Sequence, residues 1–352
     1  MKKRLILGFV CAVLLFIVMT SNDGTTTIVQ RVTSFIDSTD SNDISCYEIS
    51  TSDGFPRFES DSEKPVTDKN IFFHETSCFG EKGIFLNARQ ACAVESAAYM
   101  NPWSTVYLLF LSPSKISTET EGMIRQLSSY PNIKIKRIFP ETYTKDTPLE
   151  EWYKSGVLMR SRWRRSHMSD VLRYLTLWKY GGIYLDLDVV VTTSFENLTN
   201  FAGAEDWDDV AAGVLGFSSS SLGRRMADAC LRDLKKNFRG NDWGNNGPGV
   251  ITRTLQKTCS TKYTRDMTMS RCHGFRVFPP SAFYPIHYKQ WKRYFDRENM
   301  NSTMKALEQA KAIHVWNKLS RSTKVRVDSD VPYAVIARKY CPKVFSTCGE
   351  LF

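Results

Sequence analysis

The sequence predicts an α/β fold in which a mostly parallel, twisted sheet carries helices on both faces, preceded by one N-terminal transmembrane helix. Three observations indicate this class. Short apolar runs that suit strands alternate with longer segments of helical periodicity. A double glycine, Gly181-Gly182, separates one predicted helix from a buried strand. The first twenty residues have the basic and then apolar pattern of a membrane anchor.

The N-terminal segment determines the predicted topology. Three basic residues at 2–4 precede about fifteen apolar residues that end at Met19, a short length for a membrane span. No small-residue cleavage pattern is obvious after Met19. We therefore expect a cytoplasmic tail over 1–4, an uncleaved signal anchor over 5–20 and a lumenal remainder. A short span suits the thinner membranes of the early secretory pathway, and a cleaved signal peptide is the alternative.

The rest of the chain divides into a stem and a globular domain. Residues 21–68 are rich in Ser, Thr and Asp and have few clustered apolar positions, which is typical of a poorly ordered stem. Residues 69–352 are long enough to bury one large core. Within them the pattern predicts strands over 70–73, 105–111 and 133–139 and a helix over 88–99. In such sheets, ligands bind outside the carboxyl ends of the strands.

A further helix is predicted over 169–180, with Ser169 as its N-cap and Gly181 as its stop. Asp170 and Arg173 lie three residues apart on its predicted first turn. They would share a face near the positive end of the helix dipole, where an anion or a polyol finds donors. A simple surface ion pair is the alternative role for these two residues.

Two acids, Asp186 and Asp188, stand at the exit of the strand that begins after Gly182. Side chains two residues apart in a strand share a face, so both carboxylates are expected to point at one spot. Two hard oxygen ligands suit Mg²⁺ or Mn²⁺, which in turn hold phosphate oxygens. Because a short acidic motif alone has low specificity, a solvent-exposed strand end is the competing interpretation.

Cysteines and glycosylation triplets both suit a lumenal domain. Of nine cysteines, Cys11 lies in the predicted span, and the other eight form an even set that points to disulfides. The sequence contains no Cys-x-x-Cys pair, which disfavours a zinc site. The sequence cannot fix the pairing, but short loops favour Cys259 with Cys272 and Cys78 with Cys92. Acceptor triplets for N-glycans begin at Asn197 and Asn301.

The formal net charge of +10 implies attraction to acidic partners. Nucleic acid, an anionic membrane and a diphosphate sugar all fit that description. The 47 basic residues are scattered among 37 acidic ones without a Lys/Arg tract or a reading motif, which argues against nucleic acid. The densest basic cluster, four arginines within 160–165, immediately precedes the Asp170 helix and could steer a nucleotide diphosphate.

Residues 169–174 and 178–188, which include Asp186-Leu187-Asp188, resemble the alpha-1,4-glycosyltransferases, a family that includes globotriaosylceramide synthase and an N-acetylglucosaminyltransferase relative. The resemblance runs from about residue 68 to the end of the chain. Six further blocks match in the same order, which makes the set more specific than any one motif. They are 71–77, 91–98, 246–249, 283–286, 291–295 and 314–318.

The resemblance implies a GT-A-type nucleotide-sugar-binding fold and a retaining hexosyltransferase. Such an enzyme would move galactose or N-acetylgalactosamine in alpha-1,4 linkage from a UDP-sugar to a glycosphingolipid, with Mn²⁺ or Mg²⁺ as its ion. It would be a type II protein of the Golgi membrane. The family does not fix the sugar, so an alpha-1,4-N-acetylglucosaminyltransferase acting on glycoproteins is the alternative.

The same resemblance implies catalytic and metal-binding roles. Asp188 is expected to ligate the metal directly, and Asp186 to assist through water or the ribose. His314 is a candidate third metal ligand or diphosphate contact, with a buried structural histidine as the alternative. Asn246 lies in a loop near the reacting centre, but relatives commonly carry Gln there. The shorter amide puts a catalytic role for Asn246 in doubt, and an ordinary Gly/Pro turn is the alternative.

Donor and acceptor contacts are also expected. The implied donor-binding residues are Asp170, Arg173, Tyr184, His314 and Lys318, the last of these as a diphosphate contact. Sugar rings stack their C–H faces on indole and phenol rings, so acceptor candidates are Trp243, Tyr284 and Trp291. Residues of these types are more often part of the core than ligand contacts, and Trp291 could equally belong to an apolar helix stripe.

Two function classes compete with a transferase. The run from Leu185 to Val190 also matches the opening of haloacid-dehalogenase-type phosphatases, in which Asp186 would be the nucleophile. That fold begins with this strand, whereas here other strands and a helix precede it. A membrane-anchored glycan-binding protein without turnover is the second rival, and it predicts that binding survives Asp188→Asn.

Overall fold

The computed structural model describes residues 42–49, 55–59, 65, 68–78, 84–113 and 116–352. The predicted tail at 1–4 and anchor at 5–20 lie outside these residues. No helix among the described residues is long and apolar enough to span a membrane.

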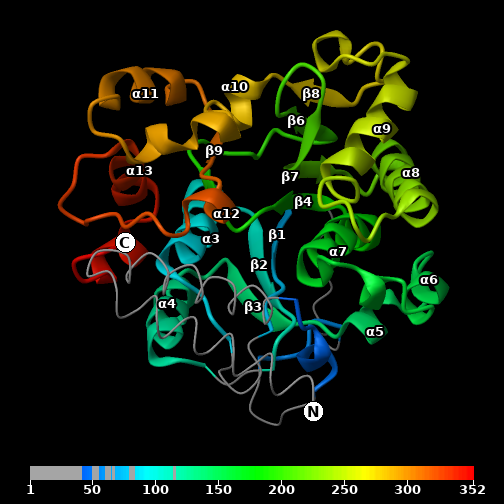
Figure 1. Cartoon of the computed structure of the whole chain (residues 1–352), viewed down its shortest axis with the longest axis horizontal. Helices are drawn as coiled ribbons and strands as arrows, with labels where there is room; N and C mark the ends of the chain where they lie inside the picture. Colours follow the sequence, from blue (N-terminus) through cyan, green and yellow to red (C-terminus); the bar gives the residue numbers. More distant parts are fainter. Residues whose placement is uncertain (1–41, 50–54, 60–64, 66–67, 79–83, 114–115) are drawn as a thin grey trace, which may run out of the picture. The chain divides into compact units, whose positions relative to one another are not determined.

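A seven-stranded sheet positions the functional residues, with strand order β3-β2-β1-β4-β7-β6-β8 (Figure 1). β3, β2, β1 and β4 run parallel, β7 is antiparallel to β4 and β6, and β8 is parallel to β6. The predicted α/β class with a mostly parallel sheet is confirmed. The strands are β1 (Asn70–Glu75), β2 (Thr105–Phe110), β3 (Ile133–Arg137), β4 (Gly182–Leu185), β6 (Phe201–Ala204), β7 (Val210–Phe217) and β8 (Arg276–Phe278).

Helices cover both faces of this sheet because side chains alternate along each strand. In β1, Phe72 joins one apolar cluster, while Ile71 and Phe73 join the cluster on the opposite face. The Phe72 face is covered by α7 (Arg164–Tyr180), α8 (Ser221–Asn237) and α9 (Pro248–Cys259). The other face is covered by α3 (Ala88–Met100) and α4 (Thr118–Ser128), and α13 (Pro332–Tyr340) and α14 (Pro342–Thr347) pack on these two helices.

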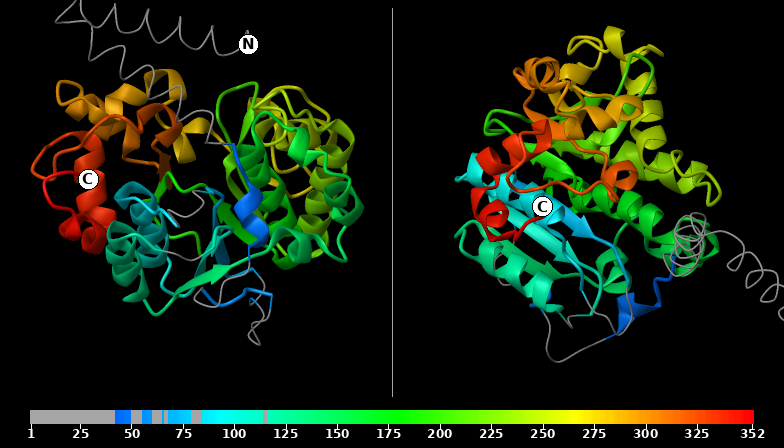
Figure 2. Two further views of the ribbon diagram at one scale, coloured as in Figure 1. Left: turned by 60° about the horizontal axis from the view of Figure 1, so that its bottom comes forward. Right: turned by 60° about the vertical axis from the view of Figure 1, so that its left-hand side comes forward.

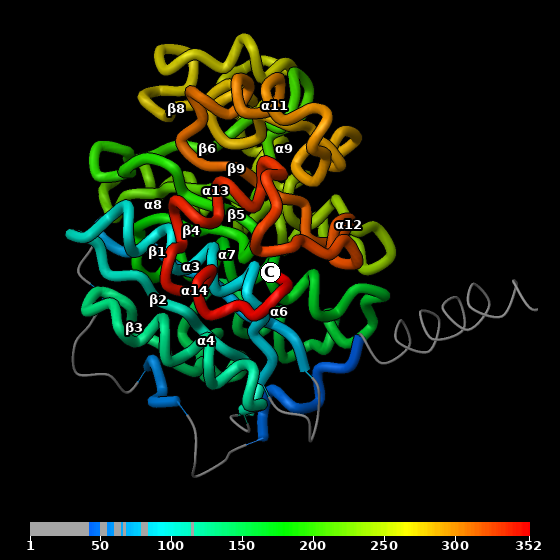
Figure 3. Tube along the Cα trace, turned by 90° about the vertical axis from the view of Figure 1, so that its left-hand side faces the viewer, coloured from blue at the N-terminus to red at the C-terminus, as the bar shows by residue number. Residues whose placement is uncertain are grey.

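The remaining elements are short and connect these layers. They are η1 (Ser45–Glu48), α5 (Pro140–Thr144), α6 (Glu150–Lys154), η3 (Leu158–Arg160), η4 (Thr264–Asp266), α10 (Pro280–Phe283), η5 (Tyr288–Phe295), α11 (Met300–Leu307) and α12 (Asn317–Ser320). Figures 2 and 3 show the C-terminal helices α13 and α14 beside α3 and α4.

After Gly182 the chain does not form one continuous strand as predicted, because it passes from the main sheet into a second, two-stranded sheet. β4 ends at Leu185, and β5 (Val189–Val191) pairs instead with β9 (Ala312–His314). The two acids between them lie in a turn, closed by the Val189 N–H donating to the Asp186 carbonyl at 3.0 Å. The prediction that the two carboxylates share one face of a strand is therefore wrong. A change of sheet, which a local pattern does not encode, brings them together.

Helix α7 begins at Arg164 rather than at Ser169, so Ser169 is not its N-cap. The extra residues are helical because they pack against neighbouring segments: buried His167 contacts Ser161 Oγ at 2.7 Å and the Asp242 carbonyl at 3.2 Å. Tertiary contacts override the local capping preference here. Asp170 consequently lies inside the helix, away from its positive end. The predicted stop is confirmed, because Gly181 is the C-cap with φ of 66°.

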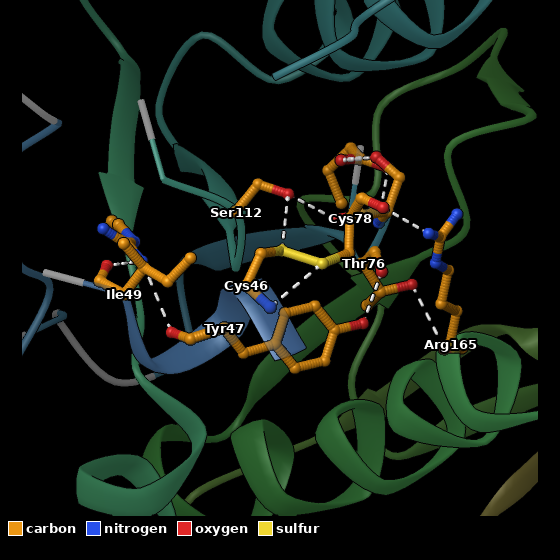
Figure 4. The surroundings of a disulfide bond; sticks show 10 residues. Cys46, Tyr47, Ile49, Thr76, Cys78, Ser112 and Arg165 are labelled. Atoms are coloured by element: carbon orange, nitrogen blue, oxygen red, sulfur yellow. Dashed lines mark hydrogen bonds between the residues drawn. A yellow bond between two sulfur atoms is a disulfide. The ribbon is translucent and has the colours of Figure 1, made fainter. Parts of the chain in front are cut away.

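Part of the predicted stem belongs to the folded body. Ile44, Tyr47 and Phe58 are buried, and Cys46 is joined to Cys78 in a disulfide (Figure 4). The Tyr47 hydroxyl donates to the Thr76 carbonyl at 2.5 Å. The predicted boundary between 68 and 69 is therefore too late for these segments.

Three disulfides form among the eight cysteines of the described residues. Cys259–Cys272 is confirmed, whereas the predicted Cys78–Cys92 pair is wrong. Cys78 bonds Cys46, and Cys92 of α3 bonds Cys341 at the C-terminal end of α13. The sequence separation of 249 between Cys92 and Cys341 explains why loop length could not reveal this pair. Cys230 and Cys348 carry free thiols.

The C-terminal helix α14 depends on a buried carboxylate of α3. Glu95 accepts hydrogen bonds from the backbone N–H groups of Lys343 (2.9 Å) and Val344 (2.7 Å) and from the Tyr130 hydroxyl (2.6 Å). Two of these donors belong to the first turn of α14, which has no intrahelical acceptor for them.

Glu95→Ala should lower the free energy of unfolding by about 3 kcal/mol, because it leaves the buried Val344 N–H and two part-buried donors without an acceptor. Urea unfolding measures this loss. Exposed Glu308→Ala is the matched control and should stay within about 0.5 kcal/mol of wild type. Equal stability of the two variants would contradict the role given to Glu95.

Candidate functional site

The functional residues gather at the carboxyl edge of the parallel strands. Asp186 follows β4, and Glu75 ends the neighbouring strand β1. The antiparallel strand β7 starts at this edge, and its Gly213 carbonyl accepts from the Asp186 N–H at 2.9 Å. This is the position expected for ligands in such sheets.

Three side chains form a candidate metal site. His314 Nε2 lies 3.1 Å from Asp188 Oδ1 and 3.8 Å from Asp186 Oδ2. One ligand atom from each of these residues lies within 4.8 Å of the other two. The pairing of β5 with β9 sets Val189 opposite His314 and so brings the histidine to the acids. The two carboxylates suit Mn²⁺ or Mg²⁺ and so fit the expected ion, and the imidazole offers a nitrogen as a third ligand.

Asp186 is held by side chains of α7 and β4. Its Oδ1 forms an ion pair with Arg173 Nη1 at 3.2 Å and accepts a hydrogen bond from the Tyr184 hydroxyl at 2.7 Å. Arg173 also pairs with Asp170 at 3.1 Å and donates to the Ala212 carbonyl at 2.9 Å. The structure thus joins the predicted residues Asp170, Arg173 and Tyr184 to Asp186 in one network.

Asp188 is held by the segment after β9. Its Oδ2 accepts from the Asn317 N–H at 2.8 Å, and its carbonyl accepts from the Val315 N–H at 2.9 Å. Between them Trp316 adopts a left-handed conformation with φ of 57°, which directs the Asn317 N–H at the carboxylate. Asn317 Oδ1 and the nearby Tyr284 hydroxyl are buried without a hydrogen-bond partner in the part of the chain that the structure describes.

Burial disfavours the charged forms of all three candidate ligands, and the charged groups around each one determine whether its pKa is raised or lowered. For Asp186, Arg173 and His314 outweigh burial and hold the pKa of the carboxyl well below its usual range. For Asp188, burial outweighs the attraction of His314 and raises the pKa. The pKa of His314 is raised because Asp188 and Asp186 outweigh its burial. A cation therefore meets one firmly ionised carboxylate, and its charge would favour ionisation of the second.

Asp170 lies beside this cluster under a close backbone contact. Burial raises its pKa to about 7, although Arg173 opposes the shift. A Cβ placed on Gly247 would stand 2.3 Å from Asp170 Oδ1, so any larger residue at this position would displace the Asp170 carboxylate. The Gly247 carbonyl accepts from the Tyr174 hydroxyl at 2.6 Å, which fixes the loop over Asp170.

Sequence reasoning missed Gly213. A Cβ at this β7 position would lie 2.8 Å from Asp186 Oδ2 and 3.2 Å from His314 Cδ2. Its glycine therefore leaves room for the metal-binding side chains. The run of small residues at 211–213 was a signal of close approach, but the sequence does not show what approaches.

The other predicted residues are placed differently. The buried Asn246 amide is directed at the Arg239 backbone, accepting from its N–H at 2.9 Å and donating to its carbonyl at 2.8 Å. Lys318 Nζ lies over the Trp243 ring, 3.7 Å from its centroid. Tyr284 is buried, with its ring 5.6 Å from that of His314. Trp291 packs edge-on against Phe295, with 5.7 Å between ring centroids.

A buried acid at the end of β1 predicts a pH dependence of stability. Burial raises the pKa of Glu75 from 4.5 to about 7, although its two hydrogen bonds from Ser77 oppose the shift. Between pH 4.5 and 7 the folded state keeps a proton that the unfolded state releases, so stability falls as the pH rises through this window.

Glu75→Gln should remove about 3 kcal/mol of this decline, because the neutral amide has no proton to lose. The measurement is the free energy of unfolding at pH 5 and pH 8 for both proteins. Exposed Glu151→Gln serves as the control and should keep the wild-type slope. Parallel pH profiles for Glu75→Gln and wild type would contradict the assignment.

Comparison with known proteins agrees with this geometry. A model described as "Alpha 1,4-glycosyltransferase conserved region" matches residues 219–348. A second, "Glycosyltransferase sugar-binding region containing DXD motif", matches residues 87–204. Human lactosylceramide 4-alpha-galactosyltransferase is 34% identical over 282 residues, which cover 78% of this chain and 76% of that protein. Human alpha-1,4-N-acetylglucosaminyltransferase is 28% identical over 260 residues, covering 72% and 74%.

Proposed function

This chain belongs to the alpha-1,4-glycosyltransferase family, and from that premise we propose that it transfers galactose or N-acetylgalactosamine in alpha-1,4 linkage from a UDP-sugar to a glycosphingolipid. Membership makes the chain a hexosyltransferase and removes the phosphatase and non-catalytic alternatives. The proposal adds the donor, the acceptor and retention of the donor configuration. The glycolipid acceptor is favoured by the 34% identity to the lactosylceramide enzyme.

One observation carries the proposal: Asp186, Asp188 and His314 offer three ligand atoms within 4.8 Å of one another at the carboxyl edge of the sheet. We propose that these residues hold Mn²⁺ or Mg²⁺. The bound ion would supply a Lewis acid that neutralises the charge of the leaving diphosphate.

The chain's own residues then have distinct tasks. Arg173 and Tyr184 fix the orientation of Asp186, and the Asn317 N–H fixes that of Asp188. Asp170, buried next to Arg173, is positioned to accept hydrogen bonds from donor hydroxyls. These groups are held before substrate arrives, so little reorganisation is needed during the reaction.

Retention requires either a protein nucleophile or a front-face reaction, in which the leaving diphosphate takes the acceptor's proton. Asn246 is poorly suited to be the nucleophile, because both heteroatoms of its amide pair with Arg239. We therefore favour the front-face route. The anomeric configuration of the first-formed product, read by proton NMR, tests retention.

We further propose that the protein is a single-pass type II protein of the Golgi membrane with its catalytic domain in the lumen. The three disulfides support an oxidising compartment. Both predicted glycan acceptors, Asn197 and Asn301, have exposed side chains. Protease protection of the full chain in sealed vesicles tests the orientation.

The deciding experiment is a donor panel with the purified full chain and Mn²⁺. UDP-galactose, UDP-N-acetylgalactosamine and UDP-N-acetylglucosamine are each offered with lactosylceramide, an arthropod-type glycolipid and a mucin-type glycopeptide. The proposal expects transfer of galactose or N-acetylgalactosamine to a glycolipid. Consumption of no donor, even by hydrolysis, would overturn it.

A second candidate is an alpha-1,4-N-acetylglucosaminyltransferase acting on glycoproteins, favoured by the 28% identity to that enzyme. The same panel separates the two, because this candidate transfers N-acetylglucosamine to the glycopeptide.

A further inference from the structure

Two exposed tryptophans flank Lys318, which directly follows Asn317 of the candidate site. Trp163 is 40% exposed and Trp243 is 45% exposed. Lys318 Nζ lies 3.7 Å from the Trp243 ring centroid and 5.2 Å from that of Trp163. The Trp243 indole N–H donates to Ser166 Oγ at 2.7 Å. Trp243 is thus fixed at its edge by Ser166 and on one face by a cation–π contact.

The three segments that build this cluster each reach the candidate site. Trp163 and Ser166 lie at the start of α7, the helix that carries Asp170 and Arg173. Trp243 is followed four residues later by Gly247, which packs on Asp170. Lys318 follows Asn317, whose N–H donates to Asp188. Lys318, which lies against both indole rings, is close enough to Asp170 for their charges to attract each other, so the indoles are linked to the donor site through this lysine.

Two other aromatic candidates for the acceptor are occupied by packing. Tyr284 is 2% exposed, and Trp291 contacts Phe295 edge-on. Trp163 and Trp243 instead present apolar ring area to solvent, which costs free energy unless something covers it. A ring held in place before binding loses little conformational entropy when a ligand stacks on it. The C–H face of a hexose is a ligand of matching shape and polarity.

We propose that Trp243 and Trp163 form the acceptor subsite, in which Trp243 stacks on the terminal hexose of the acceptor glycan. Lys318 and Ser166 are positioning residues that hold the Trp243 ring. The inference rests on the proposed function and names where that reaction takes its acceptor. The occupant is a sugar rather than a lipid bilayer, because the lysine held between the two rings also interacts with Asp170 of the donor site.

The test uses the purified full chain and a soluble lactoside without lipid. Trp243→Ala should raise the acceptor KM about tenfold, as expected for loss of one aromatic stacking contact, and change the donor KM by less than about twofold. Trp243→Phe should recover part of the loss, because a phenyl ring still stacks. Ser166→Ala should give a smaller rise, again in the acceptor KM alone. Trp103→Ala is the matched control, since Trp103 is 77% exposed beside the amino end of β2 and should leave both KM values unchanged.

Lactoside binding in the presence of UDP, followed by saturation-transfer NMR, gives a second measurement that needs no turnover. Loss of binding in Trp243→Ala but not in Trp103→Ala supports the subsite even if no donor is consumed, in which case the proposed function fails alone. Unchanged lactoside KM and binding in Trp243→Ala overturn the subsite. Weakened binding to phosphatidylcholine vesicles with unchanged lactoside kinetics would assign the pair to the membrane instead.

Discussion

Replacing Asp188 with Asn should lower sugar transfer on the order of a thousandfold. The amide keeps the size of the side chain and can still accept from the Asn317 N–H, 2.8 Å away in the wild type. It loses the negative charge that faces His314 at 3.1 Å and that a divalent ion would need. Transfer rates at saturating Mn²⁺, together with Mn²⁺ affinity from calorimetry, measure the effect.

Asp208→Asn is the matched control for this variant. Asp208 is an exposed acid in the β6–β7 loop, so the same change of charge should alter transfer by no more than about twofold. Both proteins should melt near the wild-type temperature. If Asp188→Asn kept wild-type activity and Mn²⁺ affinity, the metal assignment would be wrong.

Gly213→Ala is expected to lower transfer about a hundredfold without touching any ionisable group. The added Cβ would lie 2.8 Å from Asp186 Oδ2 and 3.2 Å from His314 Cδ2, so one of these groups must move. Asp186 has little freedom to move, because Arg173 and Tyr184 hold it at 3.2 and 2.7 Å. The same transfer assay and Mn²⁺ titration detect the change.

Gly122→Ala provides the control, because a Cβ at this α4 position meets no atom within 4 Å. It should keep full activity and gain up to about 1 kcal/mol of stability from better helix propensity. Full activity in Gly213→Ala would show that Asp186 and His314 can move without loss of transfer, which contradicts the prediction.

The sequence predicts those elements whose causes are local. The strands at 70, 105 and 133 and the helix stop at Gly181 follow from alternation, periodicity and a glycine that tolerates positive φ. The start of α7 does not, because the added turn contains His167, which packs against Ser161 and against the distant Asp242.

The candidate site also combines residues that the sequence reveals with residues that only the fold brings together. Asp186 and Asp188 are visible as a motif, but His314 reaches them only because the chain leaves the main sheet after Leu185 and β5 pairs with β9. Family resemblance indicated His314, whereas no local pattern did. Gly213 could not be predicted for a related reason. Its role depends on the side chains of Asp186 and His314 that lie next to it, and both come from other parts of the chain.

The bond between Cys46 and Cys78 has a mechanical consequence. It anchors the start of the body next to Thr76 and Ser77, directly after the strand end that carries Glu75 (Figure 4). In the proposed type II topology, residues 21–41 join the body at this point to the membrane anchor, and their length would set which acceptors come within reach of the site. Shortening or extending residues 21–41 should therefore alter turnover of bilayer-embedded acceptors and leave that of freely diffusing sugars constant.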